Sequence, residues 1–366
     1  MKVVYLDNNA TTAVAPEVFD AMTPFLSDLW GNPSSMHAFG GQVRKHIDRA
    51  RQRVAELIGA EEDEIIFTGC GTESDNTAVI SALKADSRRR HIVTSRVEHP
   101  AVLSLCQRLE KEGHPVTWLS VDAKGMIDLD EVRRSVGEGT GVVSVMYANN
   151  ETGVIFPVEE VGEIAKAAGC FFHVDAVQAA GKIPLDMRRS AIDYLALSGH
   201  KLHAPKGVGV LYIRKGTKFS PLIIGGHQEM GRRGGTENVA SIVGLGAACE
   251  LAGRKMEEEN VRVKALRDRL ERALLSSTPD ARLNGHPEMR LPNTSNISFE
   301  YVEGESILLR LNELGICASS GSACTSGSLE PSHVLRAMGV PYTAAHGSVR
   351  FSLSRYTTEE EIDFVI

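Results

Sequence analysis

Two ionisable residues, Asp175 and Lys201, each follow a short apolar run that is typical of a buried strand. In open α/β sheets, ligands bind beyond the carboxyl ends of the strands, so both side chains are expected at one crevice. A lysine that forms a Schiff base, with an aspartate facing a pyridine nitrogen, is how proteins hold pyridoxal 5′-phosphate (PLP). Taken singly, the two residues also fit a surface lysine and a helix N-cap. Ser198 and His200, beside the lysine, offer anion-binding groups and favour the cofactor site.

A glycine-bearing segment, residues 68–76 (Thr-Gly-Cys-Gly-Thr-Glu-Ser-Asp-Asn), precedes a helical run. Backbone N–H groups at such a helix start bind phosphate, and Gly71 and Thr72 are the expected donors. The segment lacks the Gly-Lys-Ser/Thr of a Walker loop. Many helices begin in this way, so the motif gains weight only beside the lysine and the aspartate.

Three further polar side chains adjoin predicted strands. His99 can stack on an aromatic cofactor and carry a proton near neutral pH, or can be a hydrogen-bonded loop histidine. Asn150, with Asn149, offers amide groups to a hydroxyl or carboxylate, or forms a turn. Arg350, inside a strand-like run, presents a fork to a substrate carboxylate or makes an exposed salt bridge.

Cys324 lies in a run of ten residues, 319–328, that is rich in serine and glycine and contains no bulky side chain. Such a composition is typical of a flexible segment. Five residues on either side of a loop tip reach at most ~17 Å, so a thiol there can enter a pocket and then leave it. The alternative is a structural cysteine, which prefers apolar surroundings that this segment does not supply.

Two patterns look like metal sites, His173-x-Asp175 and His200-x-x-His203. They follow separate strands and have no third ligand at a suitable spacing, so we do not predict a metal centre from them.

Strand-like and helical segments alternate from about residue 50 to residue 250, which predicts an α/β fold with a largely parallel sheet and helices on both faces. Residues 208–213 follow Ser198 so closely that they are expected to pair antiparallel. We expect a large domain at 13–250 and a smaller α+β domain from 1–12 and 251–366, with residues 278–293 as a loop. A capping box at 358–361 opens a helix that stops two turns later, at Ile366, which suggests a missing C-terminal segment.

Composition narrows the function classes. The formal net charge of −7 argues against a nucleic-acid-binding protein, which needs a basic patch. No signal peptide and no stretch as long as a transmembrane helix is visible, so we expect a cytoplasmic protein without membrane contact. The six cysteines form no Cys-x-x-Cys pair and fit a reducing compartment.

Together these motifs resemble the cysteine desulfurases of the NifS/IscS kind, in the class V branch of PLP enzymes of fold type I. The matching segments run from residue 5 to residue 356, and the serine- and glycine-rich loop around Cys324 is the most specific of them. The similarity is closer to NifS than to IscS. The matching segments are residues 5–12, 31–35, 71–75, 97–100, 148–153, 173–178, 198–201, 232–238 and 319–327.

The resemblance implies a mostly parallel seven-stranded sheet and a role for each candidate residue. Lys201 would hold PLP, Asp175 its ring nitrogen and Gln178 its ring hydroxyl, while His99 would stack on the ring and act as acid and base. The phosphate would be bound by Gly71, Thr72, Ser198 and His200, and by Thr236 of the partner in an obligate homodimer. Asn150 would contact cofactor and substrate, and Arg350 the substrate carboxylate.

The chemistry implied is a sulfurtransferase reaction that converts L-cysteine to L-alanine. Cys324 would keep the sulfur as a persulfide and pass it to an iron–sulfur scaffold protein that serves nitrogen fixation. Cys324 would also be a transient ligand of the cluster that it shares with the scaffold. Alternatives are a selenocysteine lyase or aminotransferase of the same fold, a non-enzymatic sulfur carrier and a metallohydrolase. An aminotransferase needs no thiol, so the Cys324 loop argues against it.

Overall fold

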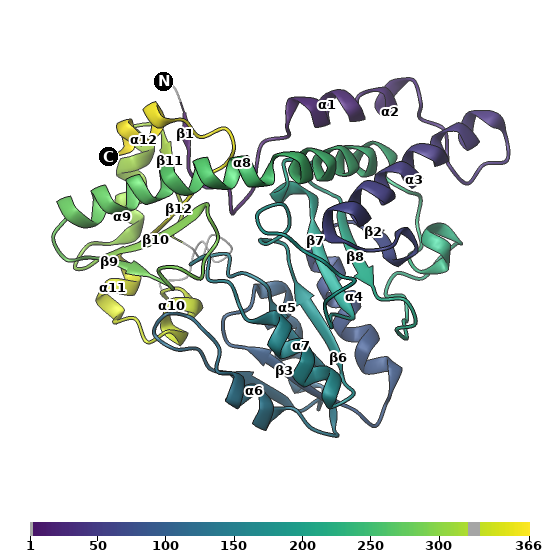
Figure 1. Cartoon of the computed structure of the whole chain (residues 1–366), viewed down its shortest axis with the longest axis horizontal. Coiled ribbons are helices and arrows are strands. Elements are labelled where there is room, and N and C mark those ends of the chain that lie inside the picture. Colours follow the sequence, from purple (N-terminus) through teal and green to yellow (C-terminus); the bar gives the residue numbers. More distant parts are fainter. Residues whose placement is uncertain (1–2, 321–329) are drawn as a thin grey trace.

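The computed structural model describes residues 3–320 and 330–366. Its centre is a seven-stranded sheet in the order β2-β8-β7-β6-β5-β3-β4 (Figure 1). Only β8 runs antiparallel to its neighbours, including β7, as the short connection after Ser198 predicted. The predicted mostly parallel sheet is confirmed. The strands are β2 (Ile65–Thr68), β3 (His91–Ser95), β4 (Val116–Leu119), β5 (Thr140–Met146), β6 (Phe171–Asp175), β7 (Tyr194–Ser198) and β8 (Gly209–Ile213).

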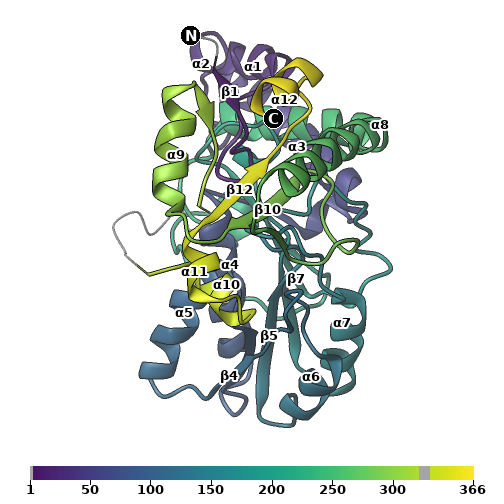
Figure 2. The same cartoon turned by 90° about the vertical axis from the view of Figure 1, so that its left-hand side faces the viewer.

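Helices cover both faces of this sheet, as Figure 2 shows for α4 and α5 on one side and α6 and α7 on the other. Alternate residues of each strand feed two separate apolar cores, because successive side chains point to opposite faces. His173 and Asp175 therefore share the face of β6 on which α4 packs. These helices are α4 (Gly71–Ala85), α5 (Pro100–Lys111), α6 (Leu129–Ser135) and α7 (Val158–Ala167). A further helix, α3 (Ala38–Ile58), packs against β2 and against the long helix α8.

A long helix, α8 (Val239–Ser277), leads from the large core to a second one (Figure 1). Its first half packs in the core around the large sheet, and its second half, from Val263 to Leu270, packs in a smaller core. That smaller core also contains Val4 and Leu6, so the first residues pack with the C-terminal part, as predicted. The division into domains at residue 250 stays a prediction, since α8 is continuous there.

Two small sheets complete the fold. One has the order β12-β10-β9 and the other pairs β1 with β11. The expectation of a plain loop over residues 278–293 is wrong, because β9 lies within it and pairs antiparallel with β10. The elements are β1 (Val4–Tyr5), β9 (Ala281–Asn284), β10 (Thr294–Phe299), β11 (Ile316–Cys317), β12 (Ser348–Ser352), α9 (Gly304–Glu313) and α12 (Glu359–Val365).

The remaining helices are short. The capping box predicted at Thr358 is present, since its side chain accepts from the Glu361 N–H. The apolar residues of α10 and α11 pack in the large core rather than the smaller one. None of the described helices is both long and apolar enough to cross a membrane. The short helices are α1 (Pro16–Met22), α2 (Pro24–Ser27), α10 (His333–Ala337), α11 (Tyr342–His346), and the 3-10 turns η1 (Glu62–Glu64), η2 (Gly199–Lys201) and η3 (Gln228–Gly231).

Candidate active site

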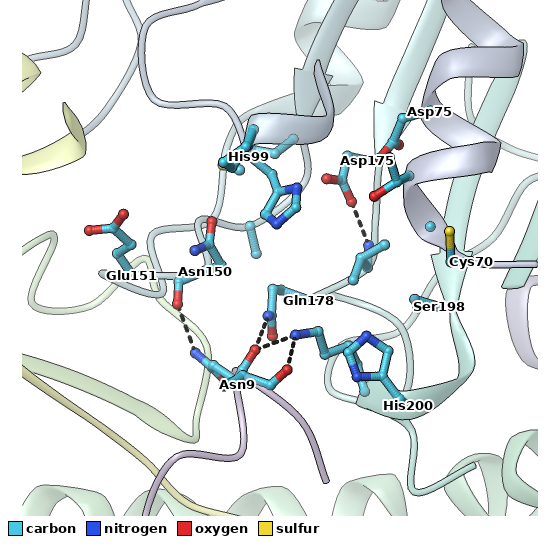
Figure 3. A pocket seen from close by; sticks show the side chains of 18 of the residues that line it. Asn9, Cys70, Asp75, His99, Asn150, Glu151, Asp175, Gln178, Ser198 and His200 are labelled. Carbon is cyan, nitrogen blue, oxygen red and sulfur yellow. Dashed lines mark hydrogen bonds between the residues drawn. The ribbon is translucent and has the colours of Figure 1, made fainter. Parts of the chain in front are cut away.

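A cavity of about 240 Å³ opens at the carboxyl ends of β5, β6 and β7 (Figure 3). The starts of α4 and α5, the N-terminal segment and β12 supply the rest of its wall. Ligand sites of open α/β folds are expected at this carboxyl edge of the sheet. The cavity brings together ten of the predicted residues: Gly71, Thr72, His99, Asn150, Asp175, Gln178, Ser198, His200, Lys201 and Arg350.

Lys201 closes the 3-10 turn η2 that follows β7. Its Nζ donates to the backbone carbonyls of Asn9 and Ala10 at 2.5 and 2.6 Å. These two backbone carbonyls hold the amine at the cavity wall, and its positive charge also acts on the nearby Asp175 carboxyl.

Asp175 ends β6 and is 6% exposed. Its Oδ1 accepts from the Val177 N–H at 2.9 Å, so it closes a local turn and does not cap a helix. Burial raises the pKa of its carboxyl, and His99 and Lys201 oppose that shift. Gln178, three residues on, donates from Nε2 to the carbonyl of Asn9 at 3.0 Å. A carboxyl and an amide thus stand at the same edge of the cavity.

His99 is the N-cap of α5, where its Nδ1 accepts from the Ala101 N–H at 3.1 Å. Burial lowers the pKa of the imidazole, and the nearby Asp175 partly opposes this. Because Nδ1 is an acceptor and the ring is neutral, the proton resides on Nε2.

The first turn of α4 forms a tight cradle. Its N-cap, Cys70, makes no side-chain capping bond. A Cβ on Gly71 would lie 2.8 Å from Val177 Cγ2 and 3.3 Å from Ser198 Cβ, so only glycine fits without displacement. His200, nearby, accepts or donates at Nδ1 with the Thr11 hydroxyl at 3.1 Å, and burial lowers its pKa to about 4. This end of the cavity therefore offers neutral donors and a helix start to an anion.

These residues fit PLP. Backbone N–H and hydroxyl donors suited to a phosphate, the Asp175 carboxyl and the Lys201 amine all line the same cavity. Gly71 allows close approach of the backbone to a ligand.

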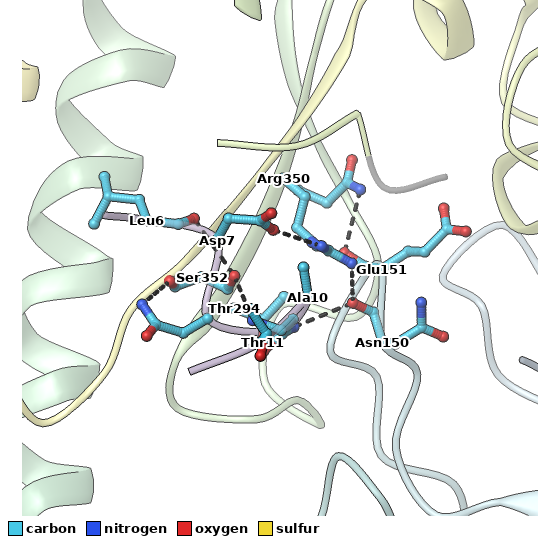
Figure 4. A network of polar contacts seen from close by, with 12 residues as sticks. Leu6, Asp7, Ala10, Thr11, Asn150, Glu151, Thr294, Arg350 and Ser352 are labelled. Carbon is cyan, nitrogen blue, oxygen red and sulfur yellow. Dashed lines mark hydrogen bonds and ion pairs between the residues drawn. The ribbon is translucent and has the colours of Figure 1, made fainter. Parts of the chain in front are cut away.

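Arg350, on β12, connects the small sheet to the cavity (Figure 4). Its Nη1 donates to the carbonyl of Asn150 at 2.9 Å and its Nη2 to Asp7 Oδ1 at 2.7 Å. The Arg350 side chain is 2% exposed. A fork held in this way is positioned to bind a carboxylate, but Asp7 already occupies one arm of it.

The N-terminal segment, residues 7–12, contacts most of the site, although its sequence alone indicated no role there. Asp7 binds Arg350, and the Asn9 carbonyl accepts from both Lys201 and Gln178. Thr12 Oγ1 donates to the His200 carbonyl at 3.0 Å. The only signal was the polar composition of residues 5–12, which matched the family without indicating a function.

One of the predicted residues that the structure describes does not line the cavity. Thr236 lines a separate hollow next to Gly69 and Arg233, away from the cavity of its own chain. Cys324 lies outside the described residues. Among the residues described, no group of three or more His, Cys, Asp or Glu is arranged to hold a metal ion. His173 instead pairs with Ser144, and His203 with the carbonyl of Ala13.

Fold and cavity define an enzyme of the class-V aminotransferase type, and the family model described as Aminotransferase class-V matches residues 4–365. A cysteine desulfurase of Trichormus azollae is 62% identical over 366 residues, covering 100% of this chain and 92% of the relative. The cysteine desulfurase NifS of Azotobacter vinelandii is 63% identical over 364 residues, covering 99% and 90%. A solved NifS-like protein has a TM-score of 0.93 and 40% identity, covering 99% of this chain and 97% of that one. The chain belongs to this family and, within it, to the cysteine desulfurases, with PLP as cofactor.

Proposed function

We propose that the cavity divides the work of cysteine desulfuration among its residues. Lys201 carries PLP, Asp175 pairs with its ring nitrogen, Gln178 contacts its ring hydroxyl, and His99 lies against the ring. The backbone of Gly71 with Thr72, Ser198 and His200 binds the phosphate. The observation that carries this proposal is the convergence of Lys201, Asp175, His99 and the start of α4 on one cavity.

When bound, PLP withdraws electrons from the Cα of the amino acid that it carries. Lys201 Nζ takes the proton from that Cα, which requires it to leave the carbonyls of Asn9 and Ala10. His99 exchanges a proton through Nε2, the nitrogen that Ala101 does not use. Burial keeps the imidazole neutral with its proton on Nε2, so it can donate that proton and then take one back at the same atom.

The substrate is L-cysteine, and we propose that Arg350 and Asn150 bind its carboxylate. The Arg350 fork is rigid and buried, which suits a planar carboxylate. Because Asp7 holds one arm, the incoming carboxylate must displace Asp7 or share the guanidinium with it.

Sulfur transfer falls to Cys324. Its thiolate attacks the substrate sulfur, an S–S bond forms, and the C–S bond breaks with its electrons going to the carbon side. L-alanine leaves and Cys324 keeps the sulfur as a persulfide. Both flanks of residues 321–329 support this assignment. Ser319 forms a β-bridge with Arg350, and His333 lines the cavity.

The cysteines that the structure describes are less suited to this step, and most of them have thiols with a raised pKa. Burial raises the pKa of the thiols of Cys106 and Cys249 to about 12, and that of Cys170 to about 11, so they form little thiolate. Cys70 lines the cavity and Cys317 is half-buried, which makes these two the rivals to exclude.

We further propose that the enzyme works as a homodimer in the cytoplasm. Thr236 is not among the residues that line the cavity of its own chain, and this supports a role for it in the partner's phosphate site. The sulfur of the persulfide would pass to a scaffold protein that assembles iron–sulfur clusters, and Cys324 would be a transient ligand of the cluster. The similarity to a NifS supports nitrogenase as the final recipient.

The proposal is tested with purified wild type and two variants. Lys201→Ala should lose the cofactor that borohydride otherwise fixes to the chain, and should release no alanine from L-cysteine. Cys324→Ser should keep the yellow cofactor but form no persulfide, as mapped by mass spectrometry. A persulfide on Cys70 or Cys317, or alanine release by Lys201→Ala at the wild-type rate, would refute the assignment.

A further inference from the structure

A row of polar side chains crosses the buried sheet behind the cavity. Register pairs Thr94 of β3 with Ser144 of β5, and Ser144 with His173 of β6, all on the face covered by α4. Each of the three is 0% exposed. Strands buried on both faces normally carry apolar side chains, so a row of three polar side chains here is unusual and indicates a specific role.

The row ends at Asp75, a residue of α4. His173 Nδ1 pairs with the Ser144 hydroxyl at 2.8 Å, and its Nε2 lies 3.4 Å from Asp75 Oδ1. Within the described part of the chain, neither His173 Nε2 nor Asp75 Oδ1 has a hydrogen-bond partner. Burial lowers the pKa of His173 to about 3, so the ring is neutral. The Ser144 hydroxyl then donates to Nδ1, and the protonated Nε2 lies 3.4 Å from Asp75 Oδ1 without completing a hydrogen bond to it.

Asp75 is 1% exposed and lines the cavity beside Asp175, as Figure 3 shows. Burial raises the pKa of its carboxyl well above the usual range, and Asp175, Glu98 and Cys70 raise it further. In the described residues, His173 is the only basic side chain within ion-pair distance of Asp75, and it is neutral. His99 and Lys201 act on Asp175 instead. Two adjacent carboxyls without a cation between them cannot both be ionised.

We propose that Asp75 is a positioning residue that holds a proton beside Asp175, kept in place by Ser144 and His173, and so leaves Asp175 as the anion that faces the ring of PLP. This inference rests on the proposed role of Asp175. A neutral Asp75 donates to Asp175, steadies its orientation and spreads its negative charge. Because an amide can replace a carboxylic acid as such a donor, Asp75→Asn should be tolerated, whereas Asp75→Leu should not.

The experiment measures the pH at which the visible absorbance of the cofactor in the holoenzyme is halfway between its protonated and deprotonated forms. Asp75→Asn should leave the midpoint within 0.3 units of wild type, taken as roughly the error of such a titration. Asp75→Leu should move it upward by about one unit, because the unshared charge on Asp175 favours the protonated cofactor. Thr77→Val is the matched control, since Thr77 is buried two residues further along α4 and its hydroxyl donates, among the residues that the structure describes, to the Glu73 carbonyl alone. Its midpoint should not move.

A second measurement does not depend on the cofactor. The infrared difference spectrum between wild type and Asp75→Asn apoprotein at pH 7 should contain the band of a protonated carboxylic acid. A carboxylate band in its place, a shift of one unit or more in Asp75→Asn, or no shift in Asp75→Leu would overturn the proposal. If Asp75→Leu does not fold, the infrared band and the Asp75→Asn midpoint decide. Wild type without any visible cofactor band would refute the PLP site itself, and the infrared result would still test Asp75.

Discussion

Replacing Gly71 by alanine tests whether the start of α4 is the phosphate cradle. The new Cβ would lie 2.8 Å from Val177 Cγ2 and 3.3 Å from Ser198 Cβ, both well inside ordinary contact distance. Val177 belongs to the turn that Asp175 closes, so a displacement there reaches the carboxyl as well. The substitution therefore disturbs both ends of the cofactor site at once.

The magnitude follows from the crowding. Overpacking by one methyl group costs about 1–3 kcal/mol in a close-packed interior. If that cost falls on the bound state, where α4 must approach the phosphate closely, each ~1.4 kcal/mol weakens binding about tenfold. We expect the half-saturating PLP concentration of Gly71→Ala apoprotein to rise about 5- to 140-fold.

The matched control is Gly41→Ala, within α3. Gly41 is exposed, and a Cβ there would meet nothing within 4 Å. Alanine in a helix interior gains about 0.5–1 kcal/mol over glycine, so this variant should be slightly more stable and bind PLP as wild type does. Titration of both apoproteins with PLP, followed by absorbance, compares them. Unchanged PLP affinity in Gly71→Ala would refute the cradle.

Three further changes test other parts of the site. Arg350→Lys keeps the charge but loses the fork, so the apparent affinity for L-cysteine should fall about tenfold or more while the cofactor absorbance remains; equal affinity would contradict its role. Burial raises the pKa of Glu98 to about 8, so its contribution to stability is present below about pH 4.5 and is lost as pH rises through 8. Glu98→Gln should therefore gain stability relative to wild type between pH 5 and 8 in urea unfolding, and a constant difference would count against this. Burial, and then Lys201, lowers the pKa of Lys182 to about 7, so wild type should gain stability as pH rises from 7 towards 10, and Lys182→Met should show a flatter profile.

Buried strands were the part of the fold that the sequence predicted best. β5, β6 and β7 are apolar over their length, and the switch to polar residues at Asp175 and after Ser198 marked their carboxyl ends. β1, β2, β4, β9 and β11 were not predicted. β4 and β9 are edge strands whose side chains are mostly half-buried, so they lack the continuous apolar run that marks a central strand. β2 is buried but only four residues long, and β1 and β11 have two residues each.

The residues of the site also fall into those that the sequence predicted and those that it missed. Residues that follow a strand directly, such as Lys201 and His99, were found because local sequence already placed them at the edge of the sheet. Residues that reach the cavity from a distance were missed. Asp7 meets Arg350 across 343 positions, and Asn9 meets Lys201 across 192.

The sequence by itself determined which side chains end the strands and which chemistry they can perform, because strand periodicity and residue type are local properties. Tertiary structure alone decided that the N-terminal segment joins Lys201 to Arg350, and that Asp75 stands beside Asp175. The first depends on contacts between residues 192 and 343 positions apart in the chain. The second depends on how α4 lies on the sheet and on the register of β5 against β6, where a shift of one residue would turn each side chain to the other face.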